Sequence, residues 1–392
     1  MRISEPQELL GYLPYHLGFQ PEESVVALSV RGQRRRVGLV MRIDIADFLH
    51  PEGRDLLRLH MEEDGAQEVL LVAYTNASFT SAPKKSPVTD APKKSPTTSA
   101  TEKSRPQASV SQLRELLVNL EAEFGADLPL MGLWVVTPEH YFSITDGAIP
   151  PRDEWDSTQK LENTAAAATA IYAGSMVAES REALAELPRA SNKDRDRAQR
   201  ATLRWLERQR TDGTGTWQLE TWQHWEDALK QQVVRAADSQ PAAPLTAPIL
   251  GRLQAGLEDI RLRDAVMISA LPEMGDLPYR SVATDAREEI ARSVDHVLDP
   301  GRAVRPGVEA KALKTLLTAI LAHCANSRST PALTLLSWIA WWEGNGARAS
   351  VLINKALEIN PSYNMARLIE RMIEMGMPPG WAQRQRELEE VG

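Results

Sequence analysis

SEPQELLGYLPYHLGFQPEESVVALSV, residues 4–30, is the stretch that decides how this chain begins to fold. Ser4 and Gln7 have the spacing of a capping box, in which each side chain bonds the backbone of the other residue at the start of a helix. Pro14 lacks a backbone N–H, so we expect it to interrupt or end that helix. The chain is therefore predicted to open with one short helix.

The helix is followed by a corner of the chain. Leu17, Gly18, Phe19 and Pro21 stand between the helical pattern and a β-rich run at residues 25–30. We expect Gly18 to supply a backbone angle that other residues adopt with difficulty, and Phe19 to anchor the corner by its bulk. The block thus predicts a helix that turns directly into the first strand.

Outward from this block, the pattern is that of an α/β domain over residues 1–150, with a mixed sheet and helices. The polar run RGQRRR separates two β-rich segments, which indicates an antiparallel hairpin. Alternating helical and strand patterns follow. The predicted strands are 25–30, 37–45, 68–74, 131–136 and 141–144, and the predicted helices are 51–64 and 110–124.

An insert interrupts this domain at about residues 77–109. It is rich in Pro, Ser, Thr, Ala and Lys, and it contains APKKSP twice. Such a composition buries too little apolar surface to offset the entropy of the chain, so we expect a disordered linker. It would leave from the strand ending at Tyr74, at the carboxyl edge of the sheet, where ligands commonly bind in α/β folds.

From about residue 155 to 380 the periodicity is helical alone, which predicts an all-helical domain. The expected helices span residues 161–178, 181–187, 192–209, 216–237, 246–258, 260–271, 285–298, 308–325, 331–343, 347–359 and 362–375.

Composition limits the classes of function. The 392 residues are 43% hydrophobic, no apolar run is long enough to cross a membrane, and no secretory signal opens the chain, so we expect a cytoplasmic protein with no membrane partner. The formal charge of −8 argues against nucleic acid as a partner. The single cysteine, Cys324, falls in an apolar helical pattern and is expected to be a small buried hydrophobe.

For catalysis, the candidates are His16, Ser24, Arg42 and Asp44. Arg42 and Asp44 alternate on one face of a predicted strand, and Ser24 would need a base such as His16 within hydrogen-bond reach. A solvated ion pair and a serine that bonds locally are the plainer interpretations of the same residues. No Gly-x-Ser-x-Gly motif accompanies them.

Metal and phosphate chemistry have no supporting motif. The seven histidines show no pair with ligand spacing, and neither a Walker A pattern nor Gly-x-Gly-x-x-Gly joins a strand to a helix. We therefore predict no metal site and no cofactor.

Near the C-terminus, residues 333–366 resemble a single tetratricopeptide unit, in which small residues let two antiparallel helices pack closely. The matching residues are Ser337, Gly344, Ala349, Ala356 and Pro361. Because such repeats need about three stacked units to be stable alone, we interpret the segment as one helical hairpin in a larger domain.

Tryptophans cluster in the same region. Trp338, Trp341 and Trp342 are candidate anchors for a protein partner, since aromatic side chains are enriched in binding hot spots. Packing in the core is the favoured alternative for the inward-facing two. A second cluster, Trp217, Trp222 and Trp225, is assigned to the core or a domain contact before a ligand platform.

The opening block also resembles a bacterial family catalogued as domain of unknown function 4192. The residues that carry the resemblance are Pro14, Leu17, Gly18, Phe19, Pro21, Ser24 and Val25. The family resemblance extends to an Arg-Asp pair, here Arg263 and Asp264. Neighbours on a helix point about 100° apart, so we expect each to pin a neighbouring element rather than pair with the other.

The resemblance implies no reaction. We therefore expect a protein-binding or adaptor protein with a protein partner, and keep as the alternative an enzyme or small-ligand-binding protein with its site on the α/β domain.

Overall fold

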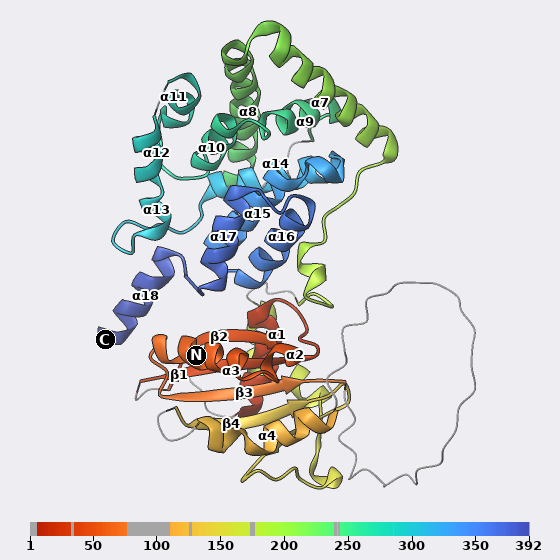
Figure 1. The fold of residues 1–392 in the computed structure, drawn as a ribbon, viewed down its shortest axis with the longest axis vertical. Coiled ribbons are helices and arrows are strands. Elements are labelled where there is room, and N and C mark those ends of the chain that lie inside the picture. The colour runs from red at the N-terminus through yellow and green to blue at the C-terminus, as the bar shows by residue number, and fades with distance from the viewer. Residues whose placement is uncertain are drawn as a thin grey trace, which may run out of the picture. The chain divides into compact units, whose positions relative to one another are not determined.

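The computed structural model describes residues 6–32, 35–76, 110–124, 128–172, 177–238, 241, 244–284 and 286–391 (Figure 1). The chain divides into two compact units, residues 1–180 and 181–392, and each is described by itself. The predicted cap at Ser4 and the predicted disordered insert at 77–109 lie outside the described residues.

A six-stranded mixed sheet forms the first unit. Its strands are β1 (Ser24–Arg31), β2 (Arg36–Asp44), β3 (Glu68–Tyr74), β4 (Leu130–Val136), β5 (His140–Ile144) and β6 (Asp156–Ser157), in the order β2-β1-β3-β4-β5-β6. The pair β3/β4 is parallel and the other pairs are antiparallel. The predicted α/β class and both predicted hairpins are confirmed.

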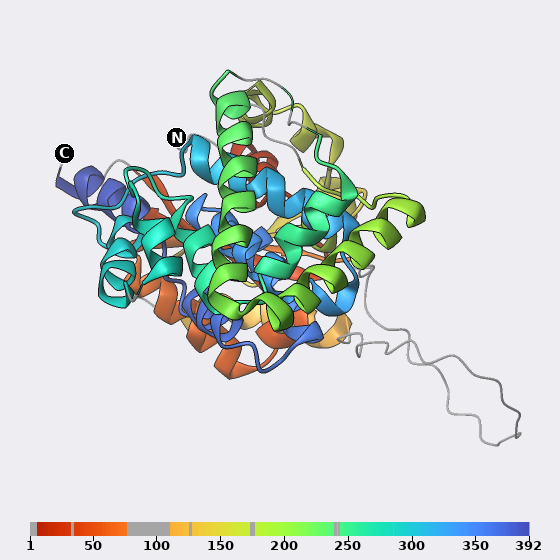
Figure 2. The same ribbon diagram turned by 90° about the horizontal axis from the view of Figure 1, so that it is seen from above.

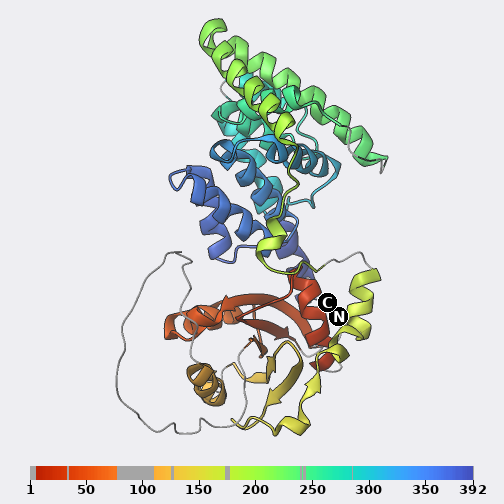
Figure 3. The same cartoon turned by 90° about the vertical axis from the view of Figure 1, so that its right-hand side faces the viewer.

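Helices cover both faces of this sheet. Val25, Ala27 and their counterparts on β3 and β4 form one core with α2 (Ile45–Phe48), α3 (Pro51–Glu63) and α4 (Val110–Phe124). The alternate side chains of β1 point to the other face and are buried as well. The buried leucines of α1 (Pro6–Leu17) lie outside the α3/α4 core, and α1 covers that second face (Figure 3).

Pro14 neither interrupts nor ends α1, contrary to the prediction. The helix continues through it to Leu17, and the backbone N–H of Gly18 donates to the carbonyl oxygen of Pro14 at 2.8 Å. The proline lies in the last turn of the helix. Its missing N–H removes only one backbone hydrogen bond there, so the helix does not end before Leu17. Its carbonyl oxygen then serves the helix end.

The corner after α1 has the predicted geometry. Gly18 has φ 81°, a left-handed conformation, and the Phe19 side chain is buried. Gly18 and Gln20 both bond the backbone of Ala178, which returns to the corner from far along the chain. The opening block is thus held by a segment that the sequence pattern did not connect with it.

The helix predicted over residues 161–178 is instead two short helices, α5 (Gln159–Glu162) and α6 (Ala165–Tyr172). The Glu8 carboxylate of α1 accepts hydrogen bonds from the backbone N–H groups of Ala165 and Ala166, at 3.2 and 2.7 Å. A carboxylate at these positions favours a new helix N-terminus. The tertiary contact with α1 explains why α6 begins separately.

The second unit is helical throughout its described residues. Its α-helices are α7 (Asn192–Asp212), α8 (Thr214–Ala237), α9 (Ala247–Gly256), α10 (Ile260–Ile268), α11 (Leu277–Ala283), α12 (Arg287–Ser293), α13 (Asp295–Leu298), α14 (Val308–His323), α15 (Thr330–Trp342), α16 (Gly346–Ile359), α17 (Asn364–Glu374) and α18 (Gly380–Val391). The long helices α7 and α8 meet at a corner (Figure 2).

Three details of this unit differ from the sequence prediction. Residues 181–187 form only the 3-10 turn Glu182–Ala185, and the helix expected at 285–298 is divided into α12 and α13. Helices α11 and α18 were not predicted at all. Proline opens α11 at a first-turn position, where its missing N–H has no helical partner anyway. Short or polar helices of this kind have a weak apolar periodicity, so the sequence pattern does not predict them.

The core of the second unit lies around α15, of which every residue is buried. Ser337 on α15 donates to the carbonyl oxygen of Ala349 on α16 at 2.7 Å, so these two helices approach closely. The same core takes in Trp217, Trp222 and Trp225 of α8. That aromatic cluster is therefore core packing within this unit.

Candidate functional site

The register of the sheet brings three of the four catalytic candidates together. Ser24 is directly opposite Asp44 on one side and Tyr74 on the other. Arg42 Nη2 donates to Asp44 Oδ1 at 2.7 Å and to the carbonyl oxygen of Glu22 at 3.3 Å. Arg42 and Asp44 thus form a local ion pair on β2.

No hydrogen bond among the described residues joins Ser24 to a base. Its side chain is fully buried, and its Oγ has no hydrogen-bond partner among the described residues. His16 lies on α1, where its Nδ1 meets the hydroxyl of Tyr12 at 3.2 Å. A nucleophilic serine needs a base in contact with its hydroxyl. The described contacts do not join Ser24 and His16 into such a pair.

The three candidate anchors on α15 are buried. Trp338, Trp341 and Trp342 are 8%, 3% and 0% exposed. The indole N–H of Trp341 donates to the carbonyl oxygen of Met377, and that of Trp342 donates to the carbonyl oxygen of Val304. These rings fix segments of the chain to α15 and offer no surface to a partner.

Arg263 and Asp264 do pair with each other, which corrects the expectation from their helical spacing. Arg263 Nε and Nη2 contact Asp264 Oδ1 at 3.0 and 2.6 Å, because the long arginine side chain folds back around the helix. Arg263 Nη1 also donates to the hydroxyl of Tyr363 at 3.1 Å. Tyr363 precedes α17, so Arg263 also pins a neighbouring helix as expected.

Among the residues that the structure describes, no group of three or more His, Cys, Asp or Glu side chains has the arrangement of a metal site. No described helix combines the length and the apolar character that a membrane span requires.

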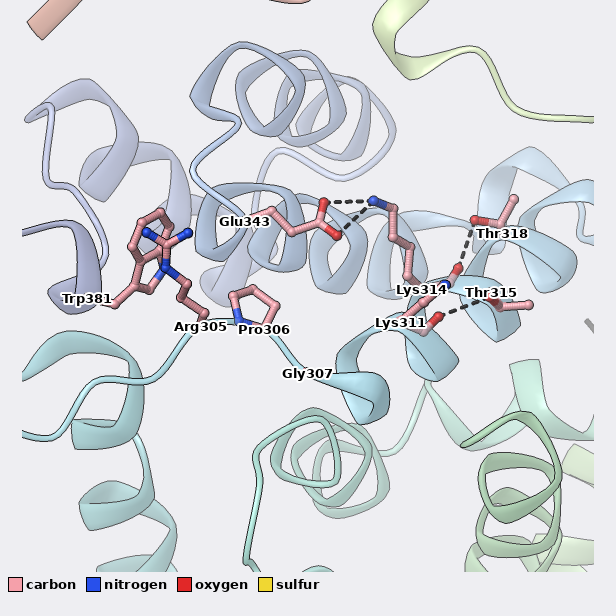
Figure 4. A pocket seen from close by; sticks show the side chains of 9 residues that line it. All are labelled: Arg305, Pro306, Gly307, Lys311, Lys314, Thr315, Thr318, Glu343 and Trp381. Atoms are coloured by element: carbon pink, nitrogen blue, oxygen red, sulfur yellow. Dashed lines mark hydrogen bonds and ion pairs between the residues drawn. The ribbon is translucent and has the colours of Figure 1, made fainter. Parts of the chain in front are cut away.

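A groove in the second unit is lined by four charged side chains. It has a volume of about 720 Å³ (Figure 4). Its walls come from the segment before α14, from α14 itself, from the end of α15 and from the start of α18. The lining residues are Arg305, Pro306, Gly307, Lys311, Lys314, Thr315, Thr318, Glu343 and Trp381. We call this hollow the α14 groove.

Trp381 forms the apolar wall of the groove. Its indole N–H donates to the carbonyl oxygen of Trp342 at 2.8 Å, and Arg384 on the same helix donates to the carbonyl oxygen of Ala303 at 2.8 Å. The guanidinium of Arg305 lies over the indole, 4.3 Å from the ring centroid. The ring is thus anchored by backbone contacts, and it holds the arginine in place.

The three cations of the groove differ in how they are held. Arg305 Nη2 donates to Gln385 Oε1 at 2.6 Å, so stacking and a hydrogen bond both orient this guanidinium. Lys314 Nζ meets both carboxylate oxygens of Glu343, at 2.7 and 2.8 Å. Lys311 is exposed and has no ion pair among the described residues. One carboxylate therefore faces three cations, and the lining has two excess positive charges.

A smaller hollow of about 430 Å³ lies near the end of α16, with Glu258 and Arg328 in its wall. These two side chains form an ion pair with each other, so their charges cancel. The smaller hollow therefore lacks the excess positive charge of the α14 groove.

No motif in the sequence singled out this groove. Lys311 and Lys314 have a spacing that places them on one helix face, and they follow Arg305 closely. That signal is common on solvated helices, so it did not single out a site. Trp381 belongs to α18, a helix that was not predicted, and only the tertiary structure brings it beside Arg305.

The fold defines a protein with a mixed-sheet α/β unit followed by a helical unit that carries a basic groove. The chain belongs to the family described as domain of unknown function DUF4192, whose profile matches residues 6–380. Comparisons with curated proteins and with solved structures found no match.

Proposed function

We propose that this chain is a binding or adaptor protein of the cytoplasm, and that its helical unit engages an acidic segment of a protein partner in the α14 groove. The observation that carries the proposal is the gathering of Arg305, Lys311 and Lys314 around one hollow beside an indole wall. Arginine and tryptophan are enriched where binding energy concentrates.

The charge of the whole chain strengthens the case for a specific site. The formal net charge is −8, so a general attraction for an acidic partner is absent. The insert at residues 80–109 contributes six cations and two anions, which leaves about −12 for the rest of the chain. A local excess of two positive charges in the groove is thus opposite in sign to the net charge of the chain.

Two further parts of the sequence interpretation belong to this proposal. The resemblance of residues 333–366 to one tetratricopeptide unit supports a helical hairpin used for protein recognition. The insert at residues 77–109 would serve as a solvated tether. Because Trp338, Trp341 and Trp342 are buried, they do not support the proposal as anchors for a partner. The proposal depends on the α14 groove instead.

The enzyme alternative has less support. Its candidates supply an ion pair between Arg42 and Asp44, but the fully buried Ser24 has no base in contact with it. The ion pair satisfies both charges locally, so by itself it does not indicate catalysis. We therefore do not propose a reaction for the α/β unit.

The test is a titration of the full-length chain against a fluorescently labelled oligoglutamate peptide, followed by fluorescence anisotropy. We expect binding that weakens as salt is added, because exposed charges are screened. Lys311→Glu reverses the charge of the least constrained cation in the groove, so it should weaken binding by about tenfold or more.

The matched control is Lys230→Glu, which makes the same charge change on the exposed face of α8, outside the groove. It should leave the affinity unchanged within about twofold, since Lys230 does not line the groove and salt screens an exposed charge. Equal losses in the two variants, or no binding of oligoglutamate at all, would remove the α14 groove as the partner site.

A further inference from the structure

The α14 groove has the charge of a site for a dianion. We infer that it binds a phosphorylated serine or threonine side chain of a protein partner, which makes the acidic segment of the proposed function a phosphopeptide; this inference rests on that proposed function. The lining carries three cations and one carboxylate. A phosphate monoester has a charge of about −1.5 to −2 at pH 7, whereas a Glu or Asp side chain has only about −1. The phosphate therefore matches the two excess positive charges more closely.

Arg305 supplies the geometry that a phosphate needs. The stacking of its guanidinium on Trp381 and the hydrogen bond to Gln385 hold the side chain in one orientation. Among the described residues, Gln385 is its only hydrogen-bond partner, so most of its five N–H groups stay available. A planar guanidinium binds phosphate oxygens through two parallel hydrogen bonds, and orienting it beforehand lowers the entropy lost on binding.

Lys311 and Glu343 are the lining side chains whose charges most directly favour or oppose an anionic ligand. Lys311 is exposed on α14 and has no ion pair among the described residues, so its ammonium is available to a ligand. Glu343 holds Lys314 through both of its carboxylate oxygens and is the one anion of the lining (Figure 4). It opposes any anionic ligand in the groove. The first turn of α14 already has Glu309 beside Gly307, so we assign no part of the binding to the helix N-terminus.

The size of the groove favours a peptide over a free ion. A volume of about 720 Å³ lies in the range of sites that hold drug-sized ligands, far more than a single phosphate group fills. Pro306 and Trp381 give an apolar wall next to the cations. The side chains that flank a phosphoserine would lie against that wall.

The experiment uses the full-length chain, immobilised, and three degenerate peptide libraries that differ only at a central residue: phosphoserine, serine or glutamate. Free inorganic phosphate and vesicles containing phosphatidic acid are separate arms. We expect retention of the phosphoserine library at about tenfold or more above the glutamate library, and none of the serine library. Inorganic phosphate alone should bind weakly.

Two variants identify the groove as the site. Lys311→Ala should weaken phosphopeptide binding about tenfold, and Lys230→Ala should not. Glu343→Gln removes the opposing carboxylate, so it should tighten binding by several fold, a gain that loss of folding cannot produce.

The outcomes separate this inference from the proposed function. Equal retention of glutamate and phosphoserine libraries, with the same dependence on Lys311, would overturn the phosphate preference and leave an acidic partner in place. If inorganic phosphate bound as tightly as the phosphoserine library, or if only the vesicles were retained, the inference that the ligand is a phosphopeptide would be overturned. If neither Lys311→Ala nor Glu343→Gln changed the affinity for the phosphopeptide, the α14 groove would be excluded as the binding site. Both proposals would then fail.

Discussion

Ser24 and Ser29 of β1 are both fully buried, but they differ in whether the hydroxyl has a hydrogen-bond partner. Ser29 donates from its hydroxyl to Oδ2 of the buried Asp64, which also accepts the backbone N–H of Leu39 at 2.8 Å. Ser24, at the start of the same strand, has a hydroxyl without a described partner. A buried carboxylate depends on its donors, because water cannot replace them. The two positions therefore make a matched pair.

Ser29→Ala should lower the free energy of unfolding by about 1–3 kcal/mol, since it removes a donor from a buried carboxylate. Ser24→Ala removes the same hydroxyl from the same strand but breaks no described hydrogen bond, so the change should be below about 1 kcal/mol. Urea unfolding followed by far-UV circular dichroism measures both. A loss at Ser24 as large as that at Ser29 would mean that the Ser24 hydroxyl has a partner after all.

At the scale of the element, close approach decides how the helices of the second unit pack. Gly251 on α9 faces α7, where a Cβ atom would overlap the carbonyl oxygen of Ala198. Thr202 on α7 donates to the carbonyl oxygen of Gly251 at 2.9 Å, which is only reachable when the helices nearly touch. The absence of a side chain at residue 251 therefore sets the spacing of this helix pair.

Gly251→Ala should lower the free energy of unfolding by about 1–3 kcal/mol, because the overlapped atom belongs to the backbone and cannot move aside. The control is Gly215→Ala in the first turn of α8, where a Cβ meets nothing within 4 Å. That variant should gain about 0.5 kcal/mol, since alanine restricts the unfolded chain. Urea unfolding followed by tryptophan fluorescence compares them, and similar shifts in both would refute the close contact.

At the scale of the whole molecule, each unit has its own core. One cluster lies between residues 25 and 155 and another between residues 185 and 381. Of the ten tryptophans, Trp134 and Trp155 are in the first unit and the other eight are in the second. Fluorescence therefore reports mainly on the helical unit, whereas circular dichroism reports on both.

A fragment of residues 181–392 should fold by itself, because its buried tryptophans pack within its own core. We expect its fluorescence emission maximum and unfolding midpoint to match the fluorescence transition of the full chain. Cys324 gives a second measurement, since burial raises the pKa of its thiol to about 11. A thiol that stays neutral and buried reacts slowly with alkylating reagents.

Rapid alkylation of Cys324 in the fragment, together with a red-shifted emission, would show that residues 181–392 depend on the α/β unit for folding. The full-length chain in urea provides the reference for the fully exposed thiol.

Much of the architecture was decided by local pattern. Short β-rich or apolar runs predicted the strands, and helical spacing predicted most of the helices, because both patterns follow from which side chains an element must bury. The corner at Gly18 and Phe19 could also be predicted from the sequence, since a left-handed backbone angle favours glycine. The family resemblance rested on the same local block.

The remaining features depend on contacts between segments that are distant in the sequence. The start of α6 depends on Glu8, which lies more than a hundred residues earlier in the chain, and Arg263 reached both Asp264 and Tyr363 where helical geometry alone predicted divergence. The α14 groove joins Arg305, Lys314 and Trp381 from separate elements. The sequence determines which side chains are charged or aromatic. Whether these side chains line one hollow depends on packing between distant segments, which local periodicity does not specify.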